Sequence, residues 1–213
     1  MSGYSFKVGD GALARYSGWM GPDKIFTTPE LQRRYSKVEI SLLTPKVTLV
    51  PAHFFAPEEA RQTLFEVVAL RESDAVDYVE VPSVGGYLIY SNSIDEALSR
   101  AISQTVLTTG GNSVPVLPEM YYLLAEAARC KDYNKIIASW QDGYLHLVVC
   151  QGKSLLLGNV FEASTFTTAQ YFIFLSMKRL QLNPEVSTIY FRTPLSSEDE
   201  MSLYRYFRSV EQV

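Results

Sequence analysis

Few side chains in this sequence combine the types and the spacing that catalysis requires. His53 and His146 are the only histidines, so a metal site built from several histidines is excluded, and either one would need carboxylate or cysteine ligands beside it. His146 and Cys150 fall on one face of a predicted strand but two pleats apart, too far for direct activation of the thiol. We interpret His146 as a core or surface histidine. No serine stands in a Gly-x-Ser-x-Gly motif, so we predict no catalytic residues and no metal ligands.

Carboxylates could support a nuclease if three or four of them converged on two metal ions. Asp142 and Glu162 stand near the ends of predicted strands, and Glu185 and the run Glu198-Asp199-Glu200 come later in the chain. That acidic run directly follows Leu195-Ser196-Ser197, a pattern typical of the capped first turn of a helix. A nuclease is therefore disfavoured.

The composition is that of an ordinary folded domain. With 213 residues, 47% of them hydrophobic and 20% charged, the chain can bury a sizeable core in one domain or two small lobes. The net charge is −4 and the longest basic run is Arg33-Arg34, so we expect no nucleic-acid partner. Cys130 and Cys150 cannot form a disulfide framework and are predicted to be reduced core thiols.

Nothing in the sequence directs the protein to a membrane. Residues 1–7 have neither the apolar core nor the small-residue cleavage site of a signal peptide. No apolar run reaches the roughly 18 residues that a membrane-spanning helix needs. We predict a cytoplasmic location without a membrane span.

The elements predicted after residue 133 have an order that few folds share. Strands are predicted over 134–140, 144–151 and 154–161, with turns at Gln141-Asp142-Gly143 and Gly152-Lys153. A helix from about 165 to 182 is apolar nearly all round, which predicts burial between a sheet and another layer. A strand over 188–191 and a closing helix that includes 201–208 complete the series. This order is typical of a small set of α/β folds.

Strands and helices also alternate in the first 130 residues. We predict a hairpin around Gly9-Asp10-Gly11, a short helix from Thr28, and a second hairpin that joins 37–43 to 46–50 about Thr44-Pro45. The predicted elements that follow are a helix from 57, strands over 76–81 and 87–91, a helix from 93 to about 107, a strand over 114–117 and a helix from 118 to about 129. Two lobes of similar plan result, an amino-terminal lobe over 1–130 and a carboxy-terminal lobe over 131–213, each with a mixed sheet flanked by helices.

Three stretches of the sequence resemble a known bacterial family. They are Val47-Thr48-Leu49-Val50-Pro51, Phe54-Phe55, and Leu155-Leu156-Leu157-Gly158-Asn159-Val160-Phe161 before an aromatic helix. From about Gly3 to its end, the chain resembles the family catalogued as domain of unknown function 3822. The resemblance implies an actin-like ATPase fold with two ribonuclease H-like lobes and no established activity. Family members carry a further strand before the position of Gly3, so we expect either that the first lobe lacks its first strand or that the gene begins further upstream.

The same resemblance makes the turn at residues 139–144 a candidate phosphate loop. Active members of the wider superfamily hold phosphates with two glycine-rich turns, each with an aspartate at a strand end. Glycine lets backbone amides approach the phosphate, and the carboxylate positions metal and water. The first loop would precede Gly3. In the second, Ser139 or Gln141 stands where the carboxylate is expected, and Trp140 and Tyr144 are bulky where small residues are needed.

The pair Asp142-Gly143 is explained by the turn alone. Ser139, Asp142 and Gly143 remain the candidates for cofactor binding. The adenosine pocket of the superfamily uses a glycine pair in the second lobe, whereas Gly152 and Gly158 are the only glycines after Cys150 and are unpaired. We predict no ATPase and no cofactor, with ATP and magnesium as the disfavoured alternative.

These observations favour a non-catalytic actin-like domain that acts through contact with a protein partner, which the sequence does not identify. Tyr204 and Arg208 are the candidate contact residues, one turn apart on the predicted last helix, which is rich in residue types of protein interfaces. Packing of both on the sheet is the alternative interpretation. The alternative function is a nucleotide-binding ATPase or kinase-like enzyme that uses the cleft between the lobes.

Overall fold

Two units divide the chain, and neither is continuous in sequence. The structure is a computed structural model that describes residues 3–9, 14–94, 99 and 114–213. The smaller unit holds residues 1–41 and 93–116, and the larger unit holds residues 42–92 and 117–213. The predicted boundary between residues 130 and 131 remains a prediction.

The smaller unit contains short elements. Strands β1 (Lys7–Val8) and β2 (Arg15–Tyr16) pair antiparallel, as the first hairpin predicts, and residues 10–13 of its turn lie outside the described residues. The helix predicted from Thr28 is a single 3₁₀ turn, η3 (Pro29–Gln32). The helix predicted over 93–107 falls almost wholly outside the described residues. Further 3₁₀ turns of the chain are η2 (Pro22–Lys24), η4 (Ala52–Phe54), η5 (Pro57–Glu59), η6 (Pro82–Val84) and η7 (Pro184–Val186).

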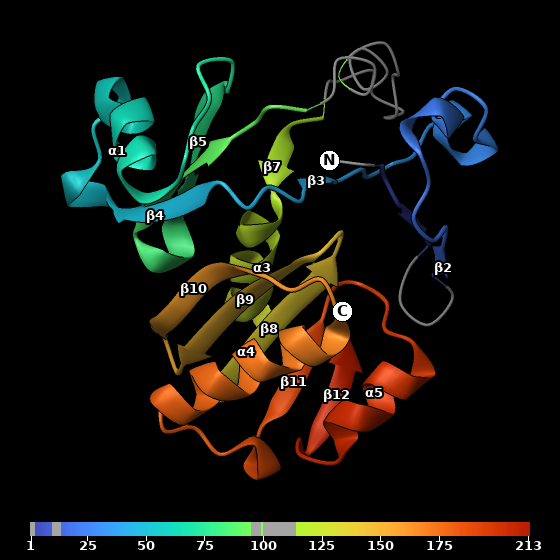
Figure 1. The fold of residues 1–213 in the computed structure, drawn as a ribbon, viewed down its shortest axis with the longest axis vertical. Coiled ribbons are helices and arrows are strands. Elements are labelled where there is room, and N and C mark those ends of the chain that lie inside the picture. The colour runs from blue at the N-terminus through green and yellow to red at the C-terminus, as the bar shows by residue number, and fades with distance from the viewer. Residues whose placement is uncertain (1–2, 10–13, 95–98, 100–113) are drawn as a thin grey trace. The chain divides into compact units, whose positions relative to one another are not determined.

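A three-stranded antiparallel sheet begins the larger unit (Figure 1). Its strands lie in the order β4 (Val47–Pro51), β6 (Gly86–Ser91), β5 (Val76–Val81). Alternate side chains face the helix α1 (Ala60–Val67), where Leu64 and Ile89 are buried. The other face carries Leu88 and Val81 and packs against the helix α3 (Glu119–Arg129).

The hairpin predicted about Thr44-Pro45 is wrong. Strand β3 (Ile40–Leu42) pairs with β7 (Val116–Pro118), and β4 pairs with β6. This pairing places Val47 and Leu49 of β4 in the cluster around α3. Burial of that apolar face stabilises the distant pairing more than a local turn would.

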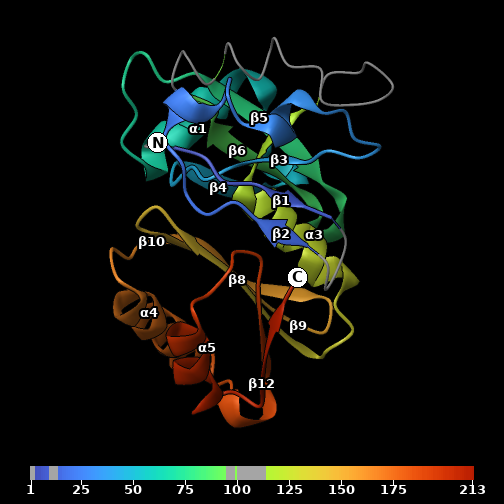
Figure 2. The same ribbon diagram turned by 90° about the vertical axis from the view of Figure 1, so that its right-hand side faces the viewer.

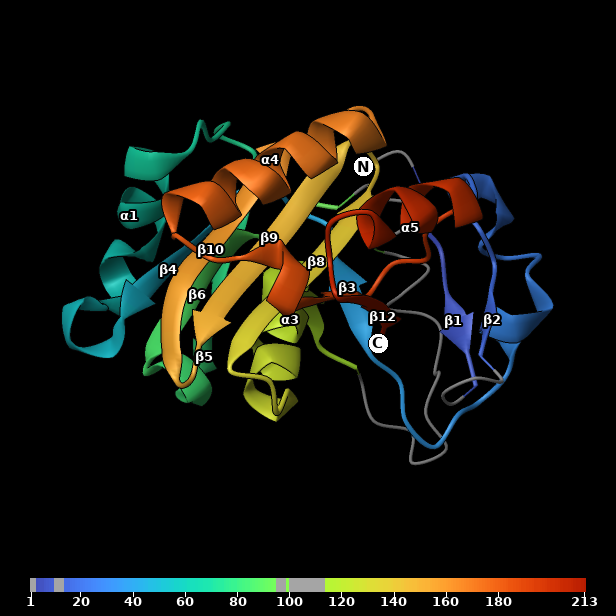
Figure 3. The ribbon, with the colours of Figure 1, turned by 90° about the horizontal axis from the view of Figure 1, so that it is seen from below.

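The five-stranded sheet of the larger unit contains the strands predicted after residue 133, in the predicted order along the chain. Strands β8 (Asn134–Gln141), β9 (Tyr144–Gln151) and β10 (Ser154–Glu162) form an antiparallel meander, and β11 (Thr188–Phe191) lies parallel to β8. The helix α3 covers one face, and the helices α4 (Phe166–Arg179) and α5 (Ser197–Tyr204) cover the other (Figure 3). The strand and helix predictions over 134–191 are therefore confirmed within a few residues.

Two predictions near the chain end are wrong. The last helix ends at Tyr204 and does not reach residue 208, and a fifth strand, β12 (Ser209–Gln212), follows and pairs parallel with β11. The predicted burial of α4 between the sheet and another layer also fails, because the side chain of Tyr171 is 60% exposed. One face of α4 packs on the sheet through Ile173 and Met177, and Gln170 contacts Ser202 of the neighbouring α5 (Figure 2).

Strand β9 lies at the centre of this packing. All six residues from Leu145 to Cys150 are buried. Leu145, Leu147 and Val149 face α4 and α5, whereas Val148 and Cys150 face α3. Of the two cysteines, Cys150 is buried and Cys130 is partly buried, and both are free thiols.

Candidate functional site

The β8–β9 turn is a tight two-residue turn. Gln141 pairs with Tyr144, and the two residues between them, Asp142 and Gly143, have φ angles of 52° and 80°. Two successive positive φ angles are those of a type I′ hairpin turn. A Cβ atom built on Gly143 would meet no atom within 4 Å, so the backbone angle, and not a close neighbour, requires glycine here.

Trp140 ties this turn to the body of the sheet. Its indole Nε1 donates to the Ala163 carbonyl at 2.8 Å, and its ring packs edge-on against Phe166 at 5.2 Å between centroids. The backbone N–H of Trp140 donates to Thr193 Oγ1 at 2.9 Å. The Ala163 N–H also donates to the Gly143 carbonyl at 2.7 Å. The turn is therefore held by protein groups at both of its ends.

Ser139, one of the two residues at the expected carboxylate position, lies directly opposite His146 in the β8–β9 ladder, whereas Gln141, the other, pairs with Tyr144 and is partly buried. Ser139 and His146 have no exposed surface. Their side chains are on the α3 face of the sheet, in the same rows as Ile137 and Val148. Within the described part of the chain, Ser139 Oγ and His146 Nδ1 have no hydrogen-bond partner.

His146 links this pair to the start of the three-stranded sheet. Its Nε2 lies 3.2 Å from the Thr44 carbonyl oxygen, so Nε2 carries the proton in the neutral ring. Burial lowers the pKa of His146, and the charge of Glu119 and the Thr44 hydrogen bond oppose that shift. A neutral, fully buried imidazole follows, held by a backbone carbonyl.

Glu119, the first residue of α3, is buried and is paired with Arg192. The guanidinium Nε donates to Glu119 Oε1 at 3.0 Å, and the Arg192 side chain lies 4.8 Å from the ring centroid of Tyr122. Sequence reasoning missed this pair, because Glu119 was interpreted only as a helix start. The opposition of Ser139 and His146 was predictable, since a two-residue turn at Asp142-Gly143 fixes the register.

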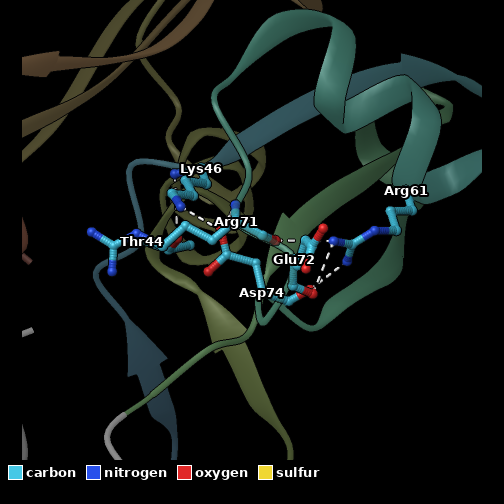
Figure 4. Close-up of polar contacts among 6 residues, drawn as sticks. All are labelled: Thr44, Lys46, Arg61, Arg71, Glu72 and Asp74. Atoms are coloured by element: carbon cyan, nitrogen blue, oxygen red, sulfur yellow. Dashed lines mark hydrogen bonds and ion pairs between the residues drawn. The ribbon is translucent and has the colours of Figure 1, made fainter.

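A second polar cluster surrounds Asp74 (Figure 4). The Asp74 carboxylate accepts from Lys46 Nζ at 2.5 Å and from the Arg71 N–H at 2.8 Å. The Arg61 guanidinium donates to the backbone carbonyls of Asp74, Arg71 and Glu72. The Lys46 hydrogen bond, above all, holds the pKa of Asp74 below its usual value. These contacts tie the loop after α1 to β4 and α1, which is a structural role.

Two cavities of the larger unit lie away from the β8–β9 turn. The first, about 20 Å³, lies among β4, α3 and β10 and is lined by Leu49, Met120 and Gly158 with their neighbours. The second, about 260 Å³, lies between η6 and α3. Pockets that bind small molecules typically have volumes of roughly 300–1,000 Å³. Both cavities are smaller than that, and the first has room only for a water or two.

The candidate contact residues Tyr204 and Arg208 do not share a helix face. Tyr204 is the last residue of α5, and its hydroxyl donates to the Val210 carbonyl at 3.0 Å. Arg208 precedes β12, and its backbone N–H donates to the Ser187 carbonyl at 3.1 Å. Both side chains are exposed, Tyr204 to 43%. Their role as contact residues remains a prediction.

Comparison with known proteins gives a family. The family model described as "Protein of unknown function (DUF3822)" matches residues 23–210. No curated protein matches the sequence. Among the described residues, no helix has the length and apolar character needed to cross a membrane.

Solved structures give the fold. A Bacteroides thetaiotaomicron protein with an actin-like ATPase fold and unknown function superposes with a TM-score of 0.69 at 17% identity, covering 100% of this chain and 87% of that one. The cytoplasmic domain of EpsL, an inner membrane component of the type II secretion system of Vibrio cholerae, matches with a TM-score of 0.48 at 14% identity, covering 91% and 77%. A PilM-PilN type IV pilus biogenesis complex matches with a TM-score of 0.39 at 15% identity, covering 78% and 65%. The predicted mixed α/β class and actin-like ATPase fold are confirmed.

Proposed function

Since the chain belongs to the DUF3822 family of proteins of unknown function, we propose that it is a non-catalytic actin-like domain that acts through contact with a protein partner. The observation that carries the proposal is that side chains of the protein itself occupy the space around the turn at residues 139–144. Trp140 lies next to the end of β8 with its indole bound to Ala163, and of the two residues at the expected carboxylate position, Ser139 is fully buried and Gln141 is an amide.

The surroundings of the turn support the same conclusion. Phosphate transfer requires a carboxylate that positions metal and water, and small residues that admit the phosphate. Ser139 instead faces the buried His146, and Trp140 packs on Phe166. Within the described residues, no group of three His, Cys, Asp or Glu side chains is placed to hold a metal ion. The side chains at residues 139–144 therefore do not supply the chemistry that a phosphate loop needs.

A thermal-shift measurement tests the proposal. The full chain is heated with magnesium and millimolar ATP, ADP or GTP, and we expect no change in melting temperature. A nucleotide at a hundred times its dissociation constant would raise the melting temperature by roughly 5–10 °C. Such a rise, lost in the variant Asp142→Ala, would contradict the non-catalytic proposal and favour the nucleotide-binding alternative.

A second arm of the test examines the predicted contact residues. Pull-downs with the native chain and with a Tyr204→Ala, Arg208→Ala variant are compared for retained proteins. Loss of a partner is expected if these side chains form the contact, because both are exposed. An unchanged set of retained proteins removes Tyr204 and Arg208 from the proposal without affecting the rest.

A further inference from the structure

Strand β5 is the outer strand of the three-stranded sheet. It pairs with β6 on one side, and among the described residues no strand pairs with its other side. The Asn92 N–H donates to the Ala75 carbonyl, so residue 75 turns its backbone groups toward the β6 side. By alternation along an antiparallel strand, the backbone groups of Val76, Tyr78 and Glu80 point away from β6.

Asp77 covers part of this edge. Its Oδ1 accepts from the Tyr78 N–H at 2.8 Å, which supplies the hydrogen bond that a neighbouring strand would otherwise give. A carboxylate that caps an edge amide discourages pairing with a second acidic edge. Asp77 and Glu80 are both exposed, so two copies of β5 side by side would bring like charges together.

The end of β5 borders the 260 Å³ groove on α3. Val81 and Pro82 form one side of it, and Tyr121, Ala125, Ala128 and Arg129 form the other. Tyr121, Ala125 and Ala128 follow one another along a single face of the helix. The two alanines leave space beside the strand edge for apolar side chains of a bound chain. An edge strand next to a helix groove is an arrangement that accepts an extended peptide as an added strand.

The distribution of charge along the chain favours a basic peptide. Residues 42–92, which contain this sheet and α1, carry seven acidic and three basic side chains, a net charge of −4. The rest of the chain carries sixteen of each and is neutral, so the whole net charge of −4 arises in this segment. Lys46 and Arg61 are bound to the Asp74 loop, which leaves the exposed acids dominant.

We propose that the β5 edge and the adjoining α3 groove bind an extended, basic peptide segment of a partner protein as a fourth strand. Basic side chains of the peptide pair with Asp77 and Glu80, which releases the Tyr78 N–H to the incoming backbone. Apolar side chains of the peptide lie over Ala125 and Ala128. This assignment rests on the proposed function and names a contact surface distinct from Tyr204 and Arg208.

A displayed library of random 12-residue peptides, selected on the immobilised full chain, tests the assignment. We expect enriched sequences that combine lysine or arginine with apolar or β-branched residues. Binding of the enriched peptides is expected to weaken at least about tenfold in Ala128→Glu, which fills the groove. In Glu80→Pro, which removes an outward N–H donor but no bond to β6, a loss of similar size is expected.

Charge reversal provides the matched comparison. Asp77→Lys should weaken binding of the same peptides about two- to fivefold, and Glu185→Lys, an equal charge change in the exposed turn η7 between α4 and β11, should leave it unchanged. Retained folding of each variant is checked by its melting temperature. Three results would overturn the assignment. They are no enrichment of any sequence, enrichment of acidic peptides, and peptide binding that Ala128→Glu and Glu80→Pro both leave unchanged.

Three other outcomes distinguish failure of this assignment from failure of the proposed function. A dimer of the chain that Glu80→Pro converts to a monomer would assign the edge to a second copy and overturn the basic peptide. Enriched peptides that bind elsewhere would overturn the β5 surface but leave the proposed function standing. Stabilisation by nucleotide, in contrast, would contradict the proposed function itself.

Discussion

At the scale of single residues, His146 is the most constrained titratable group of the site. It is fully buried, faces Ser139 and donates to the Thr44 carbonyl. Among the residues that the structure describes, the acid that acts on its pKa is Glu119, whose charge is offset by Arg192. A second proton on the imidazole therefore has little to stabilise it, and burial lowers the pKa of His146 below its ordinary value of 6.5.

This lowered pKa predicts an acid-sensitive fold. The unfolded chain binds a proton on His146 at about pH 6.5, whereas the folded chain resists it until a lower pH. The free energy of unfolding should thus fall as pH drops below about 6.5, by up to about 1.4 kcal/mol per pH unit from this residue. Urea titrations between pH 7.5 and 5 measure the dependence.

Two variants isolate the contribution. His146→Gln keeps an N–H donor for the Thr44 carbonyl but cannot titrate, so its stability should change less over this pH range than that of the native chain. His53→Gln changes the other histidine, which is exposed, and should keep the native dependence. If His146→Gln shows the same pH dependence as the native chain, another group is responsible.

Residue types predicted the turn but not the environment behind it. Asp142-Gly143 between apolar strands predicted a hairpin turn, and the φ angles confirm it. The burial of Ser139 and His146 depends on α3, which packs from a distant part of the sequence. The pairing of Glu119 with Arg192 spans 73 residues, so no local pattern could indicate it.

At the scale of elements, local sequence patterns predicted the bounds of strands and helices better than they predicted which strands pair. Val76 to Val81 and Thr188 to Phe191 were predicted from β-branched and aromatic residues, and both strands have those bounds. The partners of β4 and β7 were missed because pairing depends on burial against α3 and on other distant segments. Strand β12 was missed because four residues, with Glu211 and Gln212 exposed, give almost no periodicity.

Strand β12 can be tested against the longer helix that the sequence predicted. Val210 of β12 is buried in the cluster between the five-stranded sheet and α4 and α5. Val210→Ala should lower the free energy of unfolding by roughly 1.5–3 kcal/mol, measured by urea denaturation. Gln212→Ala, exposed on the same strand, should stay within about 0.5 kcal/mol of the native chain. Equal, small effects of both would contradict the strand.

At the scale of the whole molecule, the fold class was predictable and the division of the chain was not. The order of strands and helices after residue 133, with the family resemblance, led to the actin-like ATPase fold, which the solved structure from Bacteroides thetaiotaomicron confirms. Both compact units combine segments from separate parts of the sequence. A single boundary along the chain cannot express such a division, because the contacts within each unit join segments that are far apart in sequence.

Fragments test the predicted boundary between residues 130 and 131. Ile137, Val148 and Cys150 are buried under α3, so a fragment of residues 131–213 would expose this apolar face. A fragment of residues 117–213 keeps α3 in place. We expect the longer fragment to unfold cooperatively with a higher melting temperature and the shorter one to aggregate, as measured by light scattering and circular dichroism. Equal behaviour of the two would support the predicted boundary.

The position of strand β9 determines when its backbone amides can exchange with solvent. Its residues 145–150 are covered by α3 on one face and by α4 and α5 on the other, and its backbone is bonded to β8 and β10 on both sides. No local fraying of a helix or loop can bring water to these amides while the sheet stays whole. Their exchange with deuterium therefore follows the opening of the entire sheet, so β9 acts as an internal reporter of global stability.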